Sequence, residues 1–284
     1  MREGWVCGMT ISEAFELYKL DFIAFKNQSA KTEEMHYVAM RSLIDFTGDI
    51  QIESLTYEHI RNWKLYLDKA RSASTTRGYI IKLRVVLKFL LKRGYRVLDP
   101  DAVPVPQRRD TVPDVLTRED VAKLINTTRR LKNKAIVSFL YASGVRVGEL
   151  CSLDRSQLRD NRFTVVGKGG RARLCFIDER TRTLLDLYLQ ERTDNHPALF
   201  LTDMGTRITP GTVQETFKSL RTTSGIKCHP HTLRHTFCTE LLLSNTNLRY
   251  AQMLMGHKSL ATTQQYLHVA DHDLEEIYRL HHKV

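Results

Sequence analysis

Hydrophobic residues in the first hundred positions recur every three or four residues, a spacing that predicts amphipathic helices. The first helix is expected to begin at Thr10, because Thr10-x-x-Glu13 has the form of a capping box. A second helix is expected from about residue 31 to Thr47, with Gly48 as its stop signal. The predicted apolar faces are Ile11, Phe15, Tyr18, Phe22 and Phe25 in the first helix, Ile60, Trp63, Leu67 and Ala70 in a third, and Ile80, Leu83, Leu87 and Leu90 in a fourth.

Cap residues are expected at Thr56 for the third helix and at Ser74 for the fourth, which Gly94 would end. Four short helices in succession predict a small all-helical domain over residues 10–98, preceded by a loose extension at residues 1–9. Residues 99–113 carry four of the seven prolines, and proline stops helices and stiffens a chain. We therefore predict an interdomain linker there and a second domain over residues 114–284.

The second half of the chain mixes helical and β-like patterns. Thr117 and Asp120 mark a helix start, and a further helix is expected to reach Gly144. Two β-like runs at residues 162–166 and 173–177 flank Gly167-Lys168-Gly169-Gly170, which predicts a hairpin turn. Helices are expected at 180–190 and from residue 210 onward, with one short strand at 198–201. The predicted fold is mainly α with a small β-sheet, and an amphipathic segment at 271–281 is expected to pack on its own domain or on a neighbour.

The formal net charge of +11 favours an acidic polymer as partner. Between Lys69 and Leu98 there are nine Lys or Arg residues and no Asp or Glu, a concentration that favours a phosphate-facing surface. The predicted DNA contacts, mostly to the backbone, are Arg77, Lys82, Arg84 and Lys88 in this stretch and Arg171 and Arg173 beside the expected hairpin.

The five cysteines are odd in number and form no C-x-x-C pair, which argues against a disulfide framework or a zinc site. No signal peptide and no apolar run long enough to span a membrane is recognisable. We therefore expect a cytoplasmic protein that is associated with the nucleoid, with no membrane partner.

One stretch, Cys228 to His268, collects side chains that suit phosphate chemistry. His231 and Arg234 are three residues apart, so on a helix they project from one face. His257 follows a glycine, and Tyr266 comes nine residues later. Folding and packing do not require these residues in combination, whereas a site that binds a phosphate and attacks it with a phenol would use all of them.

Two residues outside that stretch extend the same interpretation. Cleaving a phosphodiester requires charge stabilisation on its oxygens, an in-line nucleophile and a proton donor for the leaving oxygen. Arg146 is a second candidate for gripping the phosphate, because a guanidinium matches two phosphate oxygens and stays charged. Lys168, between glycines at the expected hairpin tip, can donate a proton.

Each of these residues also has an ordinary structural interpretation when taken singly. Arg146 could be a helix-end arginine paired with Glu149, Lys168 a solvated turn lysine, and Tyr266 a packing residue. The four-residue spacing of His231 and His235 suits a metal, but no Glu follows His231 and no third ligand is evident. A zinc hydrolase is therefore disfavoured.

Five segments occur in the order and approximate spacing of the tyrosine recombinase (phage integrase) family: residues 141–150, 167–169 and 231–237, Met255-Gly256-His257, and Tyr266. The chain resembles a Xer-type member of that family over nearly its whole length. The resemblance implies an N-terminal four-helix core-binding (SAM-like) domain followed by an α+β catalytic domain. Met255, Lys258 and Cys238 depart from the commonest family pattern, but none of them removes a catalytic group.

The resemblance also implies a role for each matching residue. Arg146 and Arg234 would clamp the scissile phosphate, Lys168 would be the general acid, His231 and His257 would complete the site, Tyr266 would form a 3′-phosphotyrosyl link, and Glu149 would support the site. Neither a metal nor another cofactor is expected, because the phosphotyrosine conserves the bond energy for religation.

For partners, the resemblance implies duplex DNA with a specific recombination site. Four protomers would assemble on two such sites, exchange the C-terminal helix between neighbours and pass through a Holliday junction, with or without an accessory protein. Dimer resolution and integration or excision of a mobile element fit the chemistry equally well. Two alternatives stay open: a type IB topoisomerase-like enzyme and a non-catalytic, sequence-specific DNA-binding protein.

Overall fold

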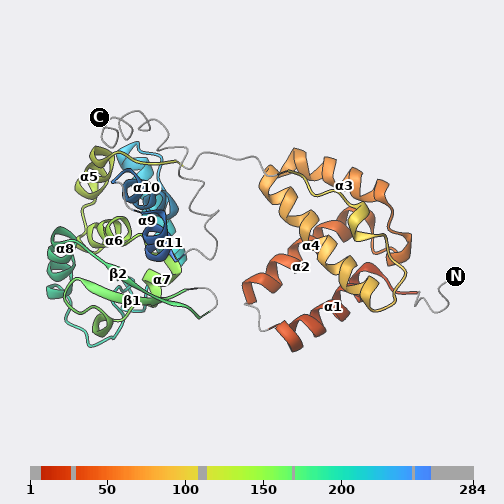
Figure 1. The fold of residues 1–284 in the computed structure, drawn as a ribbon, viewed down its shortest axis with the longest axis horizontal. Coiled ribbons are helices and arrows are strands. Elements are labelled where there is room, and N and C mark those ends of the chain that lie inside the picture. The colour runs from red at the N-terminus through yellow and green to blue at the C-terminus, as the bar shows by residue number, and fades with distance from the viewer. Residues whose placement is uncertain (1–7, 27–29, 108–113, 168–169, 245–246, 257–284) are drawn as a thin grey trace, which may run out of the picture. The chain divides into compact units, whose positions relative to one another are not determined.

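A computed structural model describes residues 8–26, 30–107, 114–167, 170–244 and 247–256 of the chain. The chain forms two compact units, residues 1–110 and 111–284 (Figure 1). The division between the units falls inside the predicted linker. Among the described residues, no helix combines the length and apolar character needed to cross a membrane.

The first unit is a helical bundle organised around its last long helix. Its elements are α1 (Ile11–Lys26), α2 (Ala30–Thr47), η1 (Ile52–Ser54), α3 (Tyr57–Ala70), α4 (Ala73–Lys92) and η2 (Pro100–Ala102). Helix α4 contacts α1, α2, α3 and η2. The predicted inward face of α4 is buried, and so is Trp63 of α3, whose indole N–H donates to the Ser42 hydroxyl at 3.3 Å.

Local hydrogen bonds explain where these helices begin. The backbone N–H of Thr10 donates to the Glu13 carboxylate at 2.8 Å and the Glu13 N–H returns to the Thr10 hydroxyl at 3.3 Å, which confirms the predicted capping box. Thr56 caps α3 as predicted. The predicted cap of α4 at Ser74 is wrong, because the extended backbone of Ser72 lets its hydroxyl accept the N–H of Thr75 and Ser74 already lies inside the helix.

Two further predictions for the first unit need correction. Ala70 is exposed rather than part of the apolar face of α3, because it lies in the last turn, at the end of the helix. Pro100 and Val103 are buried in the core of the first unit, so the beginning of the predicted linker belongs to that unit. Proline is compatible with this position, because Pro100 is the first residue of η2. The side chains of Phe22 and Phe25 lie outside the described part.

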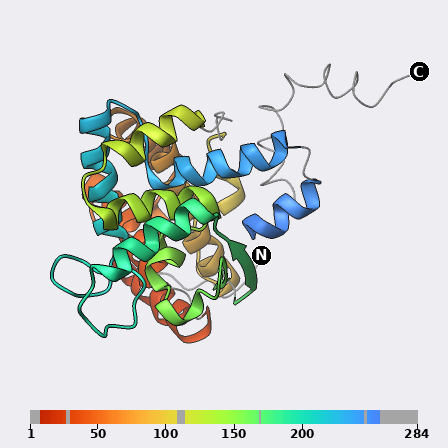
Figure 2. The ribbon, with the colours of Figure 1, turned by 90° about the vertical axis from the view of Figure 1, so that its left-hand side faces the viewer.

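The second unit is mainly helical with one small sheet (Figure 2). Its helices are α5 (Arg118–Thr127), α6 (Leu131–Ser143), α7 (Val147–Ser152), η3 (Arg155–Gln157), α8 (Glu179–Gln190), α9 (Pro210–Ser224), α10 (Pro230–Leu243) and α11 (Leu248–Met255). Helix α6 contacts α5, α8, α10 and the sheet, and α11 contacts α10 and the sheet. The mainly helical architecture confirms the predicted fold class.

The sheet consists of β1 (Arg162–Val166) and β2 (Ala172–Phe176), which pair antiparallel with Phe163 opposite Cys175 and Val165 opposite Arg173. Phe163, Val165 and Cys175 are buried, whereas the alternate positions face outward. The strand predicted at 198–201 is not formed, because this segment makes only isolated bridges, at Ala198 and at Leu201. It is buried nonetheless.

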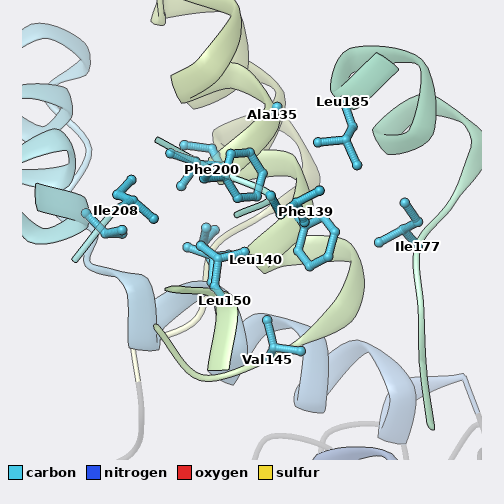
Figure 3. Close-up of a cluster of buried hydrophobic side chains, with 14 of the residues drawn as sticks. Ala135, Phe139, Leu140, Val145, Leu150, Ile177, Leu185, Phe200 and Ile208 are labelled. Atoms are coloured by element: carbon cyan, nitrogen blue, oxygen red, sulfur yellow. The ribbon is translucent and has the colours of Figure 1, made fainter. Parts of the chain in front are cut away.

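Aromatic side chains join the layers of this unit at its centre (Figure 3). Phe139 of α6 meets Phe163 of β1 with ring centroids 5.0 Å apart, and it meets Phe200 edge-on at 6.0 Å. Tyr188 of α8 stacks on Phe200 at 5.6 Å. Because Val145 and Leu150 are buried in the same core, packing fixes both ends of the segment that carries Arg146.

Candidate active site

Gly144 turns the chain so that Arg146 stands at the N-terminus of α7. Gly144 is left-handed (φ 60°) and its N–H closes α6 onto the carbonyl of Leu140 at 3.1 Å. A Cβ at this position would overlap the ring of Phe237, so α10 packs directly on the turn. Glycine is therefore required at Gly144 both by its conformation and by close packing.

Gly144→Ala is expected to lower the free energy of unfolding by about 2 to 3 kcal/mol, because it combines left-handed strain with overlap against Phe237. Gly225→Ala is the matched control, since Gly225 also ends a helix at φ 71° but has open space around its Cβ position. Chemical denaturation of both variants measures the difference. Equal losses in the two variants would contradict a packing role for Gly144.

Glu149 is the buried anion of the site, with its side chain 8% exposed. Its carboxylate accepts the backbone N–H of Arg146 at 2.8 Å and the Arg146 guanidinium at 2.9 Å. The Arg173 guanidinium donates to both carboxylate oxygens, at 2.9 and 2.7 Å. Burial opposes ionisation, but the hydrogen bonds from Arg173 and from the Arg146 backbone outweigh it and lower the pKa of Glu149 to about 2. Glu149 is therefore ionised at neutral pH.

Arg173 does not occupy the surface position expected of a DNA contact. Its side chain is 8% exposed and is engaged by Glu149, and its Nε donates to the carbonyl of Leu254 at 2.9 Å. The register of the hairpin agrees with this position, because Arg173 lies opposite the buried Val165 and two residues before the buried Cys175. From that face its long side chain reaches α7 and α11. We therefore assign Arg173 to the interior of the site, whereas Arg171 is exposed.

Arg234 joins three of the predicted motifs. It lies on α10 with 5% exposure, and its guanidinium donates to the carbonyl of Gly144 and, at 2.5 Å, to that of Met255. Gly144 is two residues from Arg146, and Met255 is two residues from His257. These hydrogen bonds fix the orientation of the Arg234 guanidinium and place the end of α11 beside the α6–α7 turn.

His231 lies on the first turn of α10 and is exposed. Partial desolvation, together with the positive charges of Arg234 and Arg146 and with His229, lowers the pKa of His231. A lowered pKa keeps the imidazole neutral at pH 7, so it can accept a proton. His231 and Arg234 share α10, and Arg234 bonds to the carbonyl of Gly144, two residues before Arg146, so the three residues belong to one region of the second unit.

His229 has a structural role that the sequence did not suggest. It is the N-cap of α10, and its Nδ1 accepts the N–H of Thr232 at 3.0 Å. Histidine is not among the common N-cap residues, so no cap signal marked this position. The cap fixes the first turn of the helix that carries His231 and Arg234.

Three of the predicted catalytic residues, Lys168, His257 and Tyr266, lie outside the described residues, as do Lys258 and the predicted terminal helix. The structure does describe Gly167, which precedes Lys168, and Gly256, which precedes His257. A Cβ on Gly167 would stand 3.7 Å from Oε1 of Glu149, so the residue before Lys168 is beside the buried anion. Helix α11 ends at Met255 with Gly256 in the left-handed conformation, φ 62°, next to Arg173.

An ion-pair network that the sequence did not predict ties the helices around the site. The Tyr141 hydroxyl donates to Glu240 at 2.8 and 2.9 Å, and Arg118 contacts the same carboxylate at 3.2 Å. Desolvation and the hydrogen bond to Glu240 raise the pKa of Tyr141 to about 12. The network links α5 and α6 to α10, and its member on α6, Tyr141, lies about one helical turn before Gly144.

The predicted DNA contacts in the first unit lie along α4. Lys88 is exposed, whereas the other three make hydrogen bonds within the unit. Arg77 donates to the carbonyl of Pro106 at 3.0 Å, and Lys82 to that of Gly78 at 3.2 Å. Desolvation lowers the pKa of Lys82, and Arg84 pairs with Asp101 at 2.5 Å. Binding a phosphate at Arg84 would require it to leave or share Asp101.

The alternative of a metal site through His231 and His235 finds no support in the described part of the chain. No group of three or more His, Cys, Asp or Glu side chains there could hold a metal ion. Desolvation and the neighbouring histidines and Arg234 lower the pKa of His235 to about 4.

Comparison with known proteins gives a consistent result. Residues 114–273 match the model of the phage integrase family. The tyrosine recombinase XerC of Natranaerobius thermophilus is 32% identical over 93% of this chain and 97% of its own length. XerC of Bacillus licheniformis is 32% identical over 93% of this chain and 94% of its own, and XerD of Oceanobacillus iheyensis is 32% identical over 76% and 78%.

Solved structures share the fold. A XerA recombinase structure is 26% identical and covers 96% of this chain and 98% of its own, with a TM-score of 0.55. The structure of a lambda integrase dimer bound to a COC′ core site is 18% identical, covers 91% and 95%, and has a TM-score of 0.77. Since the family model spans more than half of the chain and its relatives align over almost the entire length, this chain belongs to the phage integrase family of site-specific tyrosine recombinases.

Proposed function

We propose that the second unit cleaves and rejoins one DNA strand at a time, with Tyr266 as nucleophile and Arg146, Lys168, His231, Arg234 and His257 as the other catalytic residues. The observation that carries this proposal is the position of Arg234. Its guanidinium bonds to the turn before Arg146 and to the end of α11 before His257, so three separate motifs meet at one side chain. Meeting at one point is what a single phosphate site requires.

The proposed reaction begins with attack by Tyr266 on the scissile phosphate. The Tyr266 oxygen bonds to the scissile phosphorus, and its proton passes to His231, whose lowered pKa keeps the imidazole neutral and able to accept it. The bond between phosphorus and the 5′ oxygen breaks, and Lys168 gives that oxygen a proton. Arg146 and Arg234 stabilise the negative charge that develops on the other phosphate oxygens. The 3′-phosphotyrosyl link then reacts in reverse with a 5′ hydroxyl of another strand.

Glu149 supports this chemistry without reacting. It holds the Arg146 side chain from one side while leaving it 37% exposed, which suits a group that must reach a phosphate. Because the carboxylate also pairs with Arg173, it carries two positive neighbours and stays ionised throughout.

We further propose duplex DNA with a specific recombination site as the partner. The net charge of +11 and the acid-free stretch from Lys69 to Leu98 support it, and Lys88 and Arg171 are the exposed members of the predicted contact set. In the proposed reaction four protomers act on two sites through a Holliday junction, with the segment at 271–281 exchanged between neighbours. Action on chromosomal DNA would put the protein in the cytoplasm, at the nucleoid.

The test is covalent trapping on a nicked duplex, from which the short leaving fragment diffuses away. Candidate sites come from DNA flanking the gene or from selection of bound fragments. We expect a protein–DNA band on a denaturing gel, in the presence of EDTA, that Tyr266→Phe abolishes. The matched control is Tyr250→Phe, because Tyr250 of α11 is 62% exposed and has no part in the proposal.

Other outcomes would select among the alternatives. No band on DNA that the protein binds would favour a non-catalytic binding protein. A band accompanied by relaxation of supercoiled DNA at many sequences would favour a topoisomerase-like enzyme. Recombination between two copies of the selected site would distinguish the recombinase, and the origin of that site would separate dimer resolution from the movement of a mobile element.

A further inference from the structure

Arg173 connects three elements that carry separate parts of the site. It lies in β2, which runs directly from the hairpin turn, and it pairs with Val165 of β1. Its two terminal nitrogens donate to the Glu149 carboxylate of α7, at 2.9 and 2.7 Å. Its Nε donates to the carbonyl of Leu254 in the last turn of α11, at 2.9 Å. All three nitrogens of one buried guanidinium are thus used.

The chain that leaves α11 passes closely over this side chain. A Cβ on Gly256 would stand 2.9 Å from Cδ of Arg173 and 3.1 Å from one of its terminal nitrogens. A positive charge at the carboxyl end of a helix is also favourable, because the last carbonyls carry partial negative charge. Arg173 and Arg234 therefore hold adjacent carbonyls, those of Leu254 and Met255.

We propose that Arg173 is a positioning residue for DNA cleavage, which holds the end of α11 against Glu149 and so sets where the chain leading to Tyr266 begins relative to Arg146. The inference rests on the proposed roles of Tyr266 and Arg146. Only a guanidinium can do this, because a planar fork engages both carboxylate oxygens while a third N–H reaches a carbonyl. Lysine supplies the charge but not that geometry.

The test measures cleavage and DNA binding separately for Arg173→Met. We expect the single-turnover rate of covalent complex formation at saturating DNA to fall about 100-fold, the loss typical of reacting groups displaced by about 1 Å. DNA affinity should stay unchanged, and the amides in the last turn of α11 should exchange faster with solvent. Arg173→Lys should retain folding and show an intermediate slowing of cleavage.

Arg192→Met is the matched control. Arg192 is buried like Arg173, with its side chain 5% exposed, and it pairs with Asp194 at 2.6 Å and donates to the carbonyl of Ala198 at 2.7 Å. It should lose folding stability but cleave at the wild-type rate below its unfolding temperature, with unchanged exchange in α11.

The outcomes separate this inference from the proposed function. A wild-type protein without any covalent complex would overturn the proposed function itself. If the wild type cleaves and Arg173→Met cleaves equally fast, or loses only DNA affinity, the positioning role is wrong and the proposed function stands. Should Arg173→Met not fold, Arg173→Lys decides, because cleavage by that variant at the wild-type rate would overturn the inference.

Discussion

Glu149→Ala is expected to lower the free energy of unfolding by about 3 to 5 kcal/mol, the cost of leaving a buried charge without its partner. The uncompensated charge is Arg173, whose side chain is 8% exposed, and the Arg146 guanidinium loses its anchor as well. Denaturant unfolding of the variant and the wild type measures the loss. Asp203→Ala is the matched control, since Asp203 also pairs with two cations but is 64% exposed.

The control should lose no more than about 1 kcal/mol, because solvent screens an exposed pair. A double variant, Glu149→Leu with Arg173→Met, should recover most of the stability lost by Glu149→Ala, since it removes both buried charges together. A small loss for Glu149→Ala, similar to that of the control, would contradict the account of Glu149 as a buried, paired anion.

The same carboxylate makes stability depend on pH. The pKa of Glu149 is lowered from 4.5 to about 2 on folding, so its contribution is fully present above pH 4.5 and is lost as pH falls toward 2. The difference between those pKa values corresponds to about 3 kcal/mol. Comparing unfolding of the wild type and Glu149→Gln across this window isolates the contribution, which the Gln variant should lack.

Arg234→Ala is expected to slow covalent complex formation at least about 1,000-fold, because it removes a charge-stabilising donor from the proposed phosphate site. The substitution also leaves the carbonyls of Gly144 and Met255 without this partner, so some of the effect passes through folding. Arg234→Lys separates the two effects. It keeps the charge and most of the volume, but it cannot bond two carbonyls and present a planar fork to a phosphate.

Arg192→Lys provides the comparison for Arg234→Lys, since Arg192 is buried to the same extent and also donates to two carbonyls, those of Ala198 and Leu199. We expect this control to cleave normally and Arg234→Lys to fail while still binding DNA. Cleavage by Arg234→Lys at the wild-type rate would contradict the proposed role of Arg234 at the phosphate.

Local sequence signals predicted the helices well, but they failed where tertiary packing determines the conformation of a segment. The caps at Thr10, Thr56 and Thr117 were predictable because a short polar side chain satisfies N–H groups within three residues of itself. The sequence predicts that Pro100 and Val103 belong to the linker, yet both are buried. The proline content of a segment does not reveal whether the segment packs on a nearby apolar surface. The segment 198–201 is apolar enough for a strand but lies where no neighbouring strand pairs along it.

The sequence showed which residues of the site have side chains that suit phosphate chemistry, but it did not show which of these residues contact one another. Arg146, His231 and Arg234 stood out because their residue types and motif spacing suit phosphate chemistry. Arg173 was predicted as a DNA contact because a basic residue beside a hairpin resembles its exposed neighbour Arg171. Its partners are the Glu149 carboxylate, 24 residues away along the chain, and the carbonyl of Leu254, 81 residues away, and a backbone carbonyl carries no sequence signal.

By itself, the sequence determined the helical periodicity, the caps, the basic stretch and the family motifs, because each depends on residues close together in the chain or on side-chain chemistry alone. Only the tertiary structure decided that Glu149 is a buried anion shared by Arg146 and Arg173, and that Arg234 links the α6–α7 turn to the end of α11. Those contacts join residues far apart in sequence, and their strength comes from burial, which is a property of the packed chain.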